Sequence, residues 1–336
     1  MIKSPEKHRL LYKLSVAYYT DGLTQKQIAA RFGVSRSTIS RMLKEARQEG
    51  VVNITVVPPG GGTAELEREL ERVWRLEEAI VVRVTDPDDQ RTLTRELAPA
   101  AVECILRYVA GSRVVGITWG RTMSAVARAL PTRSWPDLKL VQVDGGLGPV
   151  DVLEHSSELV RRIAQKLGAQ LVPLEAPGVV STRAAAQALK SDRQISRAIA
   201  MAARADVCIV GLGVPTPDSV LLRDGTIITQ TDLERIEASG AVGDLILRHI
   251  DAQGNPVDLE VNERIIGLTL EQMRSIPRVI GIAGGTAKFA VILAALRGDW
   301  LDVLATDHVT AQALIDVRES EWRGPPIQSH SGGLRP

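Results

Sequence analysis

Residues 23–50 read LTQKQIAARFGVSRSTISRMLKEARQEG, and this stretch predicts two helices joined by a tight turn. Thr24 and Gln27 have the spacing of a capping box at the start of the first helix. Gly33 tolerates the positive φ that a tight turn requires, and Ser35 belongs to the residue types that cap a following helix. This arrangement is typical of a helix-turn-helix, whose second helix lies in the major groove of DNA.

The second predicted helix has one apolar side and one basic, hydroxylated side. Its apolar residues recur at helical spacing and are expected to face a core: Ile39, Met42, Leu43 and Ala46. The opposite side and the helix starts supply the side chains that we expect to contact bases and phosphates: Gln25, Ser35, Arg36, Ser37, Thr38, Ser40, Arg41 and Lys44. An ordinary amphipathic helix pair with a solvated basic face would show the same pattern.

The distribution of charge favours the DNA-binding interpretation. The first 50 residues contain ten Lys or Arg and four Asp or Glu, a net charge of +6. The whole chain has 41 basic and 40 acidic residues, so the other 286 residues carry 31 and 36, a net charge of −5. A basic N-terminal segment followed by a mildly acidic remainder is expected of a phosphate-binding module joined to a second domain. We therefore expect double-stranded operator DNA as a partner.

The composition of the 336-residue chain indicates a second, larger α/β domain. Hydrophobic residues make up 44% but aromatic residues only 3%, so the core must be aliphatic, as in buried parallel strands. The scarcity of aromatic residues argues against single-stranded nucleic acid as a ligand. Cys104 and Cys208 lie in separate apolar runs, which favours buried thiols in a reducing cytoplasm. No zinc-ligand spacing, signal segment or membrane-spanning run occurs, so we expect no metal, no cofactor and no membrane contact.

Breaks in the pattern suggest where the domains begin and end. A helix is expected over 6–20 and a β wing over 51–57. The Pro/Gly-rich run 58–62 opens a linker, and Thr63 begins a helix whose Leu66, Leu70 and Val73 serve either internal packing or self-association. The expected boundaries are a DNA-binding domain at 1–57, a linker with this helix at 58–78, an effector domain at 79–318, and a tail at 319–336 that ends in disorder.

From residue 79 the chain alternates apolar runs with helical patterns. Strands are expected at 79–84, 113–117, 138–143, 206–213, 278–285 and 302–307. Helices are expected near 90–109, from about 122, and near 156–167, 286–297 and 308–316. Apolar strands that end in Gly-rich or polar loops before helices predict a mostly parallel sheet of βα units.

The loops after these strands form the predicted effector site, because ligands of such sheets bind outside the carboxyl ends of the strands. Glycines also serve ordinary tight turns, so each loop alone is weak evidence. Several such loops at one edge can offer backbone amides to an anion, and we expect those of 119–122 and 284–287 to do so. Neither a phosphate-binding P-loop nor a dinucleotide fingerprint is present. The predicted effector contacts are Thr118, Trp119, Gly120, Arg121, Thr122, Asp144, Gly145, Gly146, Gly211, Gly213, Asp244, Gly284, Gly285, Lys288 and Asp307.

Along almost its whole length the chain resembles the SorC family of bacterial sugar-responsive transcription regulators. The segments that carry the resemblance are YYTDGLTQKQIAARFGVSRSTISRMLKEARQEG (18–50), VGITWGRT (115–122), VQVDGGLG (141–148), VCIVGLG (207–213), GAVGDLI (240–246) and AGGTAKFAVILAALRGDWLDVLATDHVTAQALI (283–315). The resemblance implies a winged helix-turn-helix and an effector domain similar to the Rossmann-type folds of phosphosugar isomerases and deaminases. It also implies a homotetramer whose DNA binding changes when a sugar, polyol or sugar phosphate binds. Asp144 and His308 depart from the residues usual in that family, so the identity of the effector does not transfer.

An enzymatic reading competes with this one. Because the effector domain resembles isomerases and deaminases, the chain would then be a sugar-phosphate enzyme fused to a DNA-binding domain. Such chemistry needs a general acid and base, for which Asp244 and Lys288 are available. The sequence offers no paired carboxylates or Asp–His set that would require turnover, and it assigns no catalytic residue. Asp244 and Asp307 could also serve as helix caps.

Overall fold

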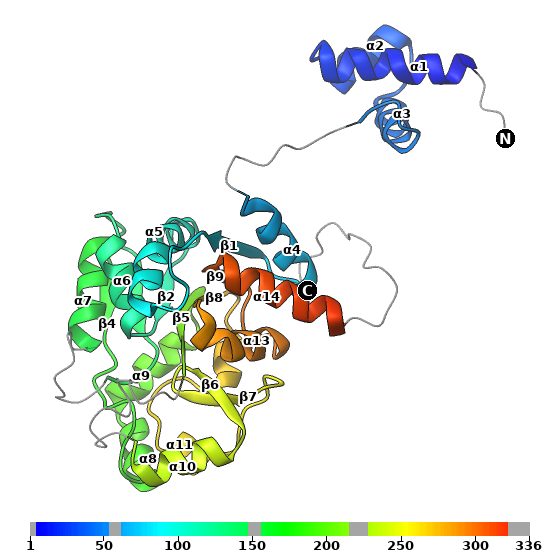
Figure 1. Ribbon diagram of the computed structural model, residues 1–336. Helices are drawn as coiled ribbons and strands as arrows, with labels where there is room; N and C mark the ends of the chain where they lie inside the picture. The colour runs from blue at the N-terminus through cyan, green and yellow to red at the C-terminus, as the bar shows by residue number, and fades with distance from the viewer. Residues whose placement is uncertain (1–4, 54–61, 147–155, 215–227, 322–336) are drawn as a thin grey trace. The chain divides into compact units, whose positions relative to one another are not determined.

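The computed structural model describes residues 5–53, 62–146, 156–214 and 228–321. Residue contacts divide the chain into two compact units, Met1–Pro59 and Gly60–Pro336, which Figure 1 shows with their helices and strands labelled. Each unit has its own hydrophobic core. We describe them separately.

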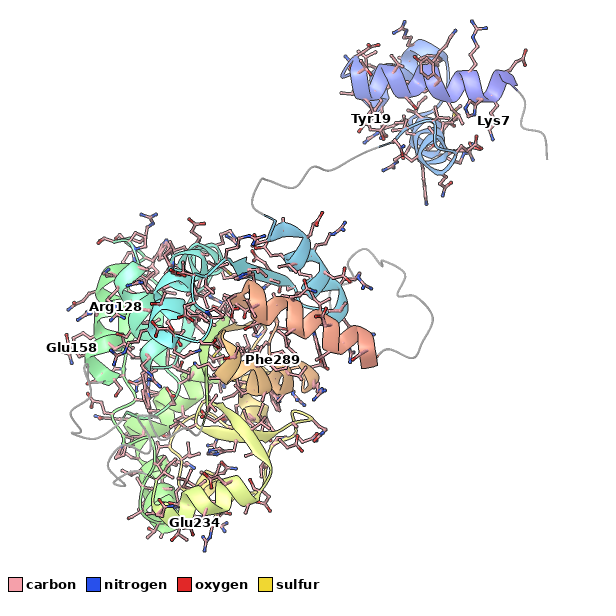
Figure 2. The ribbon with its side chains drawn as sticks, in the orientation of Figure 1. Lys7, Tyr19, Arg128, Glu158, Glu234 and Phe289 are labelled. Atoms are coloured by element: carbon pink, nitrogen blue, oxygen red, sulfur yellow. The ribbon has the colours of Figure 1, made fainter. Side chains whose placement is uncertain are left out.

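The first unit is helical and contains the predicted helix-turn-helix. Its helices are α1 (Pro5–Ser15), which continues as a short π-helical turn (Val16–Thr20), α2 (Gln25–Phe32) and α3 (Arg36–Gln48). Residues from all of them form one core: Leu14, Ala17, Ile28, Ala29, Ile39 and Leu43. On the surface, Lys7 of α1, labelled in Figure 2, forms an ion pair with Glu45 of α3.

The local signals at the helix ends of this unit are confirmed. The Thr24 side chain accepts a hydrogen bond from the Gln27 amide, and the Gln27 side chain accepts one from the Thr24 amide. Gly33 ends α2 with φ +66°. In the helix expected over 6–20, Leu11 and Leu14 are buried, whereas Leu10 is 38% exposed. Most of the predicted wing lies outside the described residues, and its first residues, 51–53, form no strand.

The second unit is built on a parallel sheet. Its parallel strands lie in the order β1 (Glu78–Val82), β9 (Val303–Asp307), β8 (Val279–Ile282), β5 (Val207–Gly213), β2 (Val114–Ile117), β3 (Lys139–Gln142) and β4 (Gln170–Val172). An antiparallel hairpin of β6 (Ala241–Leu245) and β7 (Arg248–Asp251) joins the end of β5. The sequence predicted the parallel strands except β4, and it did not predict the hairpin.

Helices cover both faces of this sheet, as Figure 1 shows. Within β5, Val207 and Ile209 join one core cluster, whereas Cys208 and Val210 join the other. Successive side chains of a strand point to opposite faces, so this alternation means that both faces are buried. One face is covered by α5 (Gln90–Val109), α6 (Arg121–Ala129) and α7 (Ser156–Leu167), and the other by α4 (Ala64–Trp74), α9 (Arg193–Ala202), α13 (Phe289–Arg297) and α14 (His308–Glu321).

Two expectations about the ends of this domain change. Leu70 and Val73 of α4 are buried in the core of the second unit, and Trp74 Nε1 donates to the Leu314 carbonyl oxygen of α14 at 3.2 Å. The apolar face of α4 therefore serves internal packing. The predicted tail at 319–336 begins too early, because α14 continues to Glu321. The rest of the tail lies outside the described residues.

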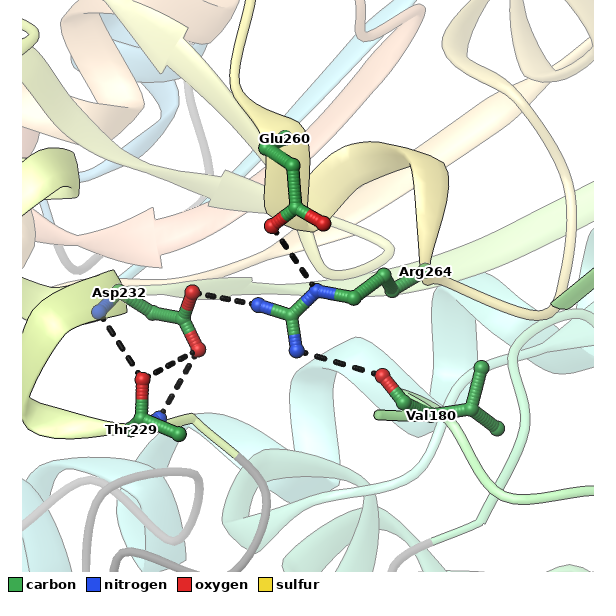
Figure 3. Close-up of polar contacts among 5 residues, drawn as sticks. All are labelled: Val180, Thr229, Asp232, Glu260 and Arg264. Carbon is green, nitrogen blue, oxygen red and sulfur yellow. Dashed lines mark hydrogen bonds and ion pairs between the residues drawn. The ribbon is translucent and has the colours of Figure 1, made fainter. Parts of the chain in front are cut away.

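A buried ion pair anchors the segments that follow β5 and β7 (Figure 3). The Arg264 guanidinium pairs with Asp232 at the start of α10 (Gln230–Ala238), and both side chains are only 6% exposed. It also donates to Glu260 of α11 (Glu260–Glu263) at 3.1 Å and to the Val180 carbonyl oxygen at 3.3 Å. Burial acts to raise the pKa of Asp232, but hydrogen bonds from Arg264 and Thr229 outweigh it and hold that pKa below its usual value.

We predict that Arg264→Met lowers the free energy of unfolding of the second unit by about 3–5 kcal/mol, because it leaves the Asp232 carboxylate buried without its cation. All five tryptophans follow residue 60, so tryptophan fluorescence during urea denaturation reports on this unit. The control is Arg183→Met, which removes an ion pair to Glu263 whose side chains are 63% and 44% exposed; its expected cost is about 0–1 kcal/mol. Equal losses in the two variants would contradict the prediction.

Candidate DNA-contact face and effector site

The exposed side of α3 carries the predicted DNA contacts. Arg36, Ser37, Ser40, Arg41 and Lys44 are exposed, while Gln25 and Thr38 are half-buried. The Ser35 hydroxyl accepts a hydrogen bond from the Thr38 amide at 3.1 Å, so Ser35 caps α3. An uninterrupted basic and hydroxylated face is thus available to a duplex, and no acidic residue lies in the first turn of the helix.

In the second unit, the end of β5 and the loops after β2 and β3 meet at the carboxyl edge of the sheet. The Gly211 amide donates to the Thr118 hydroxyl at 3.3 Å, which joins β5 to the loop after β2. Trp119 Nε1 donates to the Gly145 carbonyl oxygen at 2.9 Å, which joins that loop to the one after β3. These two hydrogen bonds join residues that are 93 and 26 positions apart in the sequence.

Helix α6 begins at this edge without a side-chain cap. Its N-cap residue is Gly120, with φ +122°, and no side chain accepts from its first amides. The first residue of the helix, Arg121, is exposed, whereas Thr122 is buried. A helix N-terminus carries unpaired amides and a partial positive charge. With Arg121 beside it, this end of α6 suits an anionic group.

The loop after β3 is fixed by its own hydrogen bonds. The Gly145 amide donates to the Ile266 carbonyl oxygen and the Gly146 amide to the Ala176 carbonyl oxygen, both at 2.9 Å. Those two amides are therefore not available to a ligand. A Cβ on Gly146 would lie 2.4 Å from the Ser156 hydroxyl oxygen, so packing explains that glycine. In this loop, the Asp144 side chain has a buried oxygen atom, Oδ1, without a hydrogen-bond partner.

Asp244 lies where β6 pairs with the end of β5. A Cβ on Gly213, its partner on β5, would lie 2.0 Å from Asp244 Oδ1, so Gly213 provides space for this carboxylate. Asp244 Oδ2 accepts from the Leu247 amide at 3.2 Å, within a hairpin turn where Ile246 and Leu247 have φ +49° and +67°. Non-glycine residues rarely adopt such angles. Asp244 thus supports a strained turn as well as facing the site.

Lys288 and Asp244 form the charged centre of the site. Burial and the Arg121 charge lower the pKa of Lys288 to about 8, against the opposing effect of the Asp244 charge. Burial raises the pKa of Asp244, while His249, the Leu247 amide and Lys288 act to lower it. Lys288 keeps some exposed surface. The two side chains expected to bind an effector are therefore near one another, from β6 and from the turn Thr286–Lys288 before α13.

Three predicted contacts instead form a structural clamp. Asp307 is fully buried; its Oδ1 accepts from the amides of Val309 and Thr310, and its Oδ2 accepts from the Gly285 amide at 2.7 Å. A Cβ on Gly284 would lie 2.4 Å from Asp307 Oδ2. Asp307 therefore caps α14 and fixes the loop after β8, and the Gly285 amide is already used. This corrects our expectation that Asp307, Gly284 and Gly285 contact the effector.

His249 is a site residue that the sequence did not reveal. It lies directly opposite Asp244 in the antiparallel β6–β7 ladder, so both side chains are on the same face. It is 3% exposed, and its Nδ1 has no hydrogen-bond partner. Burial lowers the pKa of His249, while the Asp244 charge opposes this. A single histidine in an unpredicted hairpin gives no sequence signal. Asp244 and His249 are thus an Asp–His pair that only the hairpin brings together.

A separate groove of about 990 Å³ runs between α4 and α14 and is lined by residues that include Glu65, Arg83, His308 and Asp316. It shares no residue with the site around Lys288. Within the described residues, no group of His, Cys, Asp or Glu could hold a metal ion. No helix in the same ranges has the length and apolar character needed to cross a membrane.

Comparison with known proteins assigns both units. Residues 58–316 match the family model described as "Putative sugar-binding domain", and residues 7–53 match a homeodomain-like domain. The deoxyribonucleoside regulator of Bacillus subtilis is 31% identical over 311 residues, which cover 93% of this chain and 98% of that protein. The sorbitol operon regulator of Klebsiella pneumoniae is 27% identical over 313 residues, covering 91% and 98%.

Solved structures agree with these matches. The crystal structure of the full-length sorbitol operon regulator SorC from Klebsiella pneumoniae has a TM-score of 0.70 and 25% identity, covering 92% of this chain and 99% of that one. A DeoR family transcriptional regulator from Listeria monocytogenes has a TM-score of 0.69 and 29% identity, covering 76% and 100%. The relatives are named as transcriptional regulators, not as enzymes.

We predict that anion binding at this site weakens as the pH rises through about 8, because Lys288 then loses the proton that gives it charge. Sulfate is a suitable probe, since its charge is constant over this range, and a bound anion will move the transition to higher pH. Calorimetry should show tight binding below pH 8, weaker binding above it, and little pH dependence in Lys288→Met. The control Lys139→Met removes a charge at the amino end of β3. Binding that is constant from pH 7 to 9.5 would disprove the role of Lys288.

Proposed function

The chain belongs to the SorC family of sugar-responsive transcription regulators, and we propose that it binds operator DNA through α3 and is switched by a phosphorylated sugar or polyol. We assign DNA binding to residues 1–57 and effector binding to residues 79–318. Within the expected linker 58–78, α4 packs into the core of the second unit. The proposal describes a regulator of genes for carbohydrate transport or catabolism. The relatives whose names mention sorbitol and deoxyribonucleosides support that class of target.

The observation that carries the effector proposal is the charge pattern at the carboxyl edge of the sheet. The uncapped start of α6, with Arg121, offers amides and positive charge to a phosphate group. The pKa of Lys288 responds to both that cation and the Asp244 carboxylate, so both charges are within electrostatic reach of Lys288. A carboxylate accepts hydrogen bonds from hydroxyl groups. A molecule with an anionic end and a hydroxylated end would therefore be complementary to this edge.

We also propose that the protein acts as a symmetric homo-oligomer, and the family resemblance implies a tetramer. One helix-turn-helix covers only a half-site, and paired half-sites on DNA require two-fold protein symmetry. This geometric requirement and the family resemblance support the proposal.

Operator binding should depend on the exposed face of α3. Arg41→Ala should weaken it by about 1–3 kcal/mol and leave effector affinity unchanged, because Arg41 is exposed on the first unit. Affinity should fall steeply with salt, since each phosphate contact releases counterions. Fluorescence anisotropy with labelled operator measures both effects, and light scattering of the same complexes reports their stoichiometry. Residues 60–336 alone are the control: operator binding by that fragment would refute the assignment, and a monomer on a full operator would refute the oligomer.

Lys288→Ala should abolish the response to the effector while operator binding is retained. The substitution removes a charge-assisted contact worth about 1.5–3 kcal/mol from the effector site alone. Asp244→Asn should weaken effector binding less, because an amide oxygen still accepts a hydrogen bond and can still support the Leu247 turn. The measurement is release of labelled operator during titration with sugars and sugar phosphates. A normal response in Lys288→Ala would eliminate this site, and a response only to unphosphorylated polyols would eliminate its anionic part.

A further inference from the structure

Asp144 is a buried carboxyl group with an unpaired oxygen that the proposed function does not explain. It lies two residues after β3 at the carboxyl edge of the sheet and is 3% exposed. Its Oδ1 is buried and has no hydrogen-bond partner. Unpartnered buried polar atoms are uncommon in folded proteins, because leaving such a group unpaired costs about 1–3 kcal/mol. The position and the unused oxygen both indicate that the missing partner is a ligand.

The backbone around Asp144 is held on both sides. The Val143 carbonyl oxygen accepts from the Leu268 amide at 2.9 Å, and the Gly145 amide donates to the Ile266 carbonyl oxygen at 2.9 Å. The Asp144 carbonyl oxygen accepts from Gln142 Nε2 at 2.8 Å. A loop fixed at three consecutive residues cannot easily turn the carboxyl group out to solvent. The site therefore holds Asp144 in place before any ligand arrives.

The charged groups around Asp144 leave an ionised carboxylate without compensation. Asp244 on β6 is a second carboxylate within electrostatic reach, and Cys208 on β5 is a buried thiol whose pKa burial raises. The Arg248 guanidinium donates instead to the carbonyl oxygens of Leu268 and Asn262. The remaining charged or titratable groups of this edge, Lys288, Arg121 and His249, interact with Asp244 or with one another. Burial raises the pKa of Asp144 well above its usual value, a hydrogen bond from its own backbone amide acts to lower it, and the Asp244 charge adds to the increase.

We propose that Asp144 is a specificity residue that contacts the effector as a neutral carboxylic acid and donates a hydrogen bond to one of its oxygen atoms. This inference rests on the proposed function and adds to it the direction of one contact. A protonated carboxyl group offers an O–H donor as well as acceptor oxygens, whereas an ionised one only accepts. Asp244 accepts from a hydroxyl group while Asp144 donates, so the two similar side chains select an effector with a donor at one position and an acceptor at the other.

The neutral state of Asp144 also preserves the attraction of the site for anions. Asp307, another carboxylate of this edge, is enclosed by the four hydrogen bonds of its clamp. Among the remaining charges named here, the cations Arg121 and Lys288 outnumber the carboxylate Asp244 when Asp144 is uncharged. An ionised Asp144 would balance the charges and repel the phosphate group of the effector. Asp144 can thus add polarity to the site without adding negative charge.

Two variants test the donated hydrogen bond. Asp144→Asn keeps the shape and supplies N–H donors, whereas Asp144→Ala removes the contact. Calorimetry on the full chain at pH 7 would use ribose 5-phosphate, glucose 6-phosphate and glucitol 6-phosphate as probes. For the probe that binds most tightly, the affinity of Asp144→Asn should stay within about threefold of that of the unmodified protein. The affinity of Asp144→Ala should fall about tenfold or more, and each tenfold corresponds to about 1.4 kcal/mol. Equal losses in the two variants, or no loss in Asp144→Ala, would overturn the proposal.

A measurement without ligand tests the protonation state directly. A folded-state pKa above the unfolded value of about 3.9 means that unfolding releases a proton, so stability falls as the pH rises between the two values. Across pH 5 to 8, the unmodified protein should therefore lose stability relative to Asp144→Asn, as measured by tryptophan fluorescence in urea. Parallel pH curves would show that Asp144 is ionised in the folded chain and would overturn the proposal. If none of the three sugar phosphates binds, the proposed function fails on that point, and these curves still decide the state of Asp144.

Discussion

Burial of both faces of the parallel sheet determines where polar side chains can lie in the second unit. The strands alternate their side chains between two core clusters, and helices cover each of them. A polar group placed in the middle of such a sheet would lose its water without gaining a partner, which is costly. Only the ends of the strands remain for polar side chains. At the carboxyl ends, the loops begin helices and present amides, which is why Thr118, Gly120 and Asp144 gather there.

Hydrogen bonds inside this edge determine which of its groups remain free for a ligand. The Gly145, Gly146 and Gly285 amides are satisfied by Ile266, Ala176 and Asp307. Those bonds make the loops rigid, and a rigid site loses less conformational freedom when a ligand binds. The start of α6 lacks a side-chain cap, and Lys288 and Asp244 remain with strongly perturbed pKa values. The same edge thus combines a fixed framework with a few unsatisfied polar groups.

Perturbed titratable groups are also found at catalytic sites, and Asp144, Asp244, His249 and Lys288 form a cluster of such groups. Burial keeps Asp144 and His249 away from solvent, and each has a side-chain atom without a partner. A ligand sensor and an enzyme can both use such groups to recognise hydroxyls and phosphates. The relatives that match along the whole chain are named as regulators, and a DNA-contact helix in the same chain agrees with that role. We therefore interpret the cluster as a recognition site.

The sequence by itself determined the elements that depend on local interactions. The Thr24 capping box, the Gly33 turn and the apolar face of α3 need only a few neighbouring residues, and the structure has all of them. Strands of continuous apolar residues, such as β5, were predictable because both of their faces are buried. Fold class and family also followed from these patterns. The individual site residues stay predictions, apart from those that the clamp around Asp307 has reassigned.

Only the tertiary structure decided which polar side chains keep a free group. Asp307 is the last residue of β9 and Asp144 lies two residues after β3. The Asp307 carboxylate accepts four hydrogen bonds, whereas Asp144 has an oxygen without a partner. His249 became part of the site through a hairpin whose turn lacks glycine, so no turn signal marked it. The physical reason is that hydrogen-bond partners and burial are set by residues distant in the chain: Gly285 lies 22 positions from Asp307. Local patterns specify helices and strands, whereas long-range packing specifies the chemistry between them.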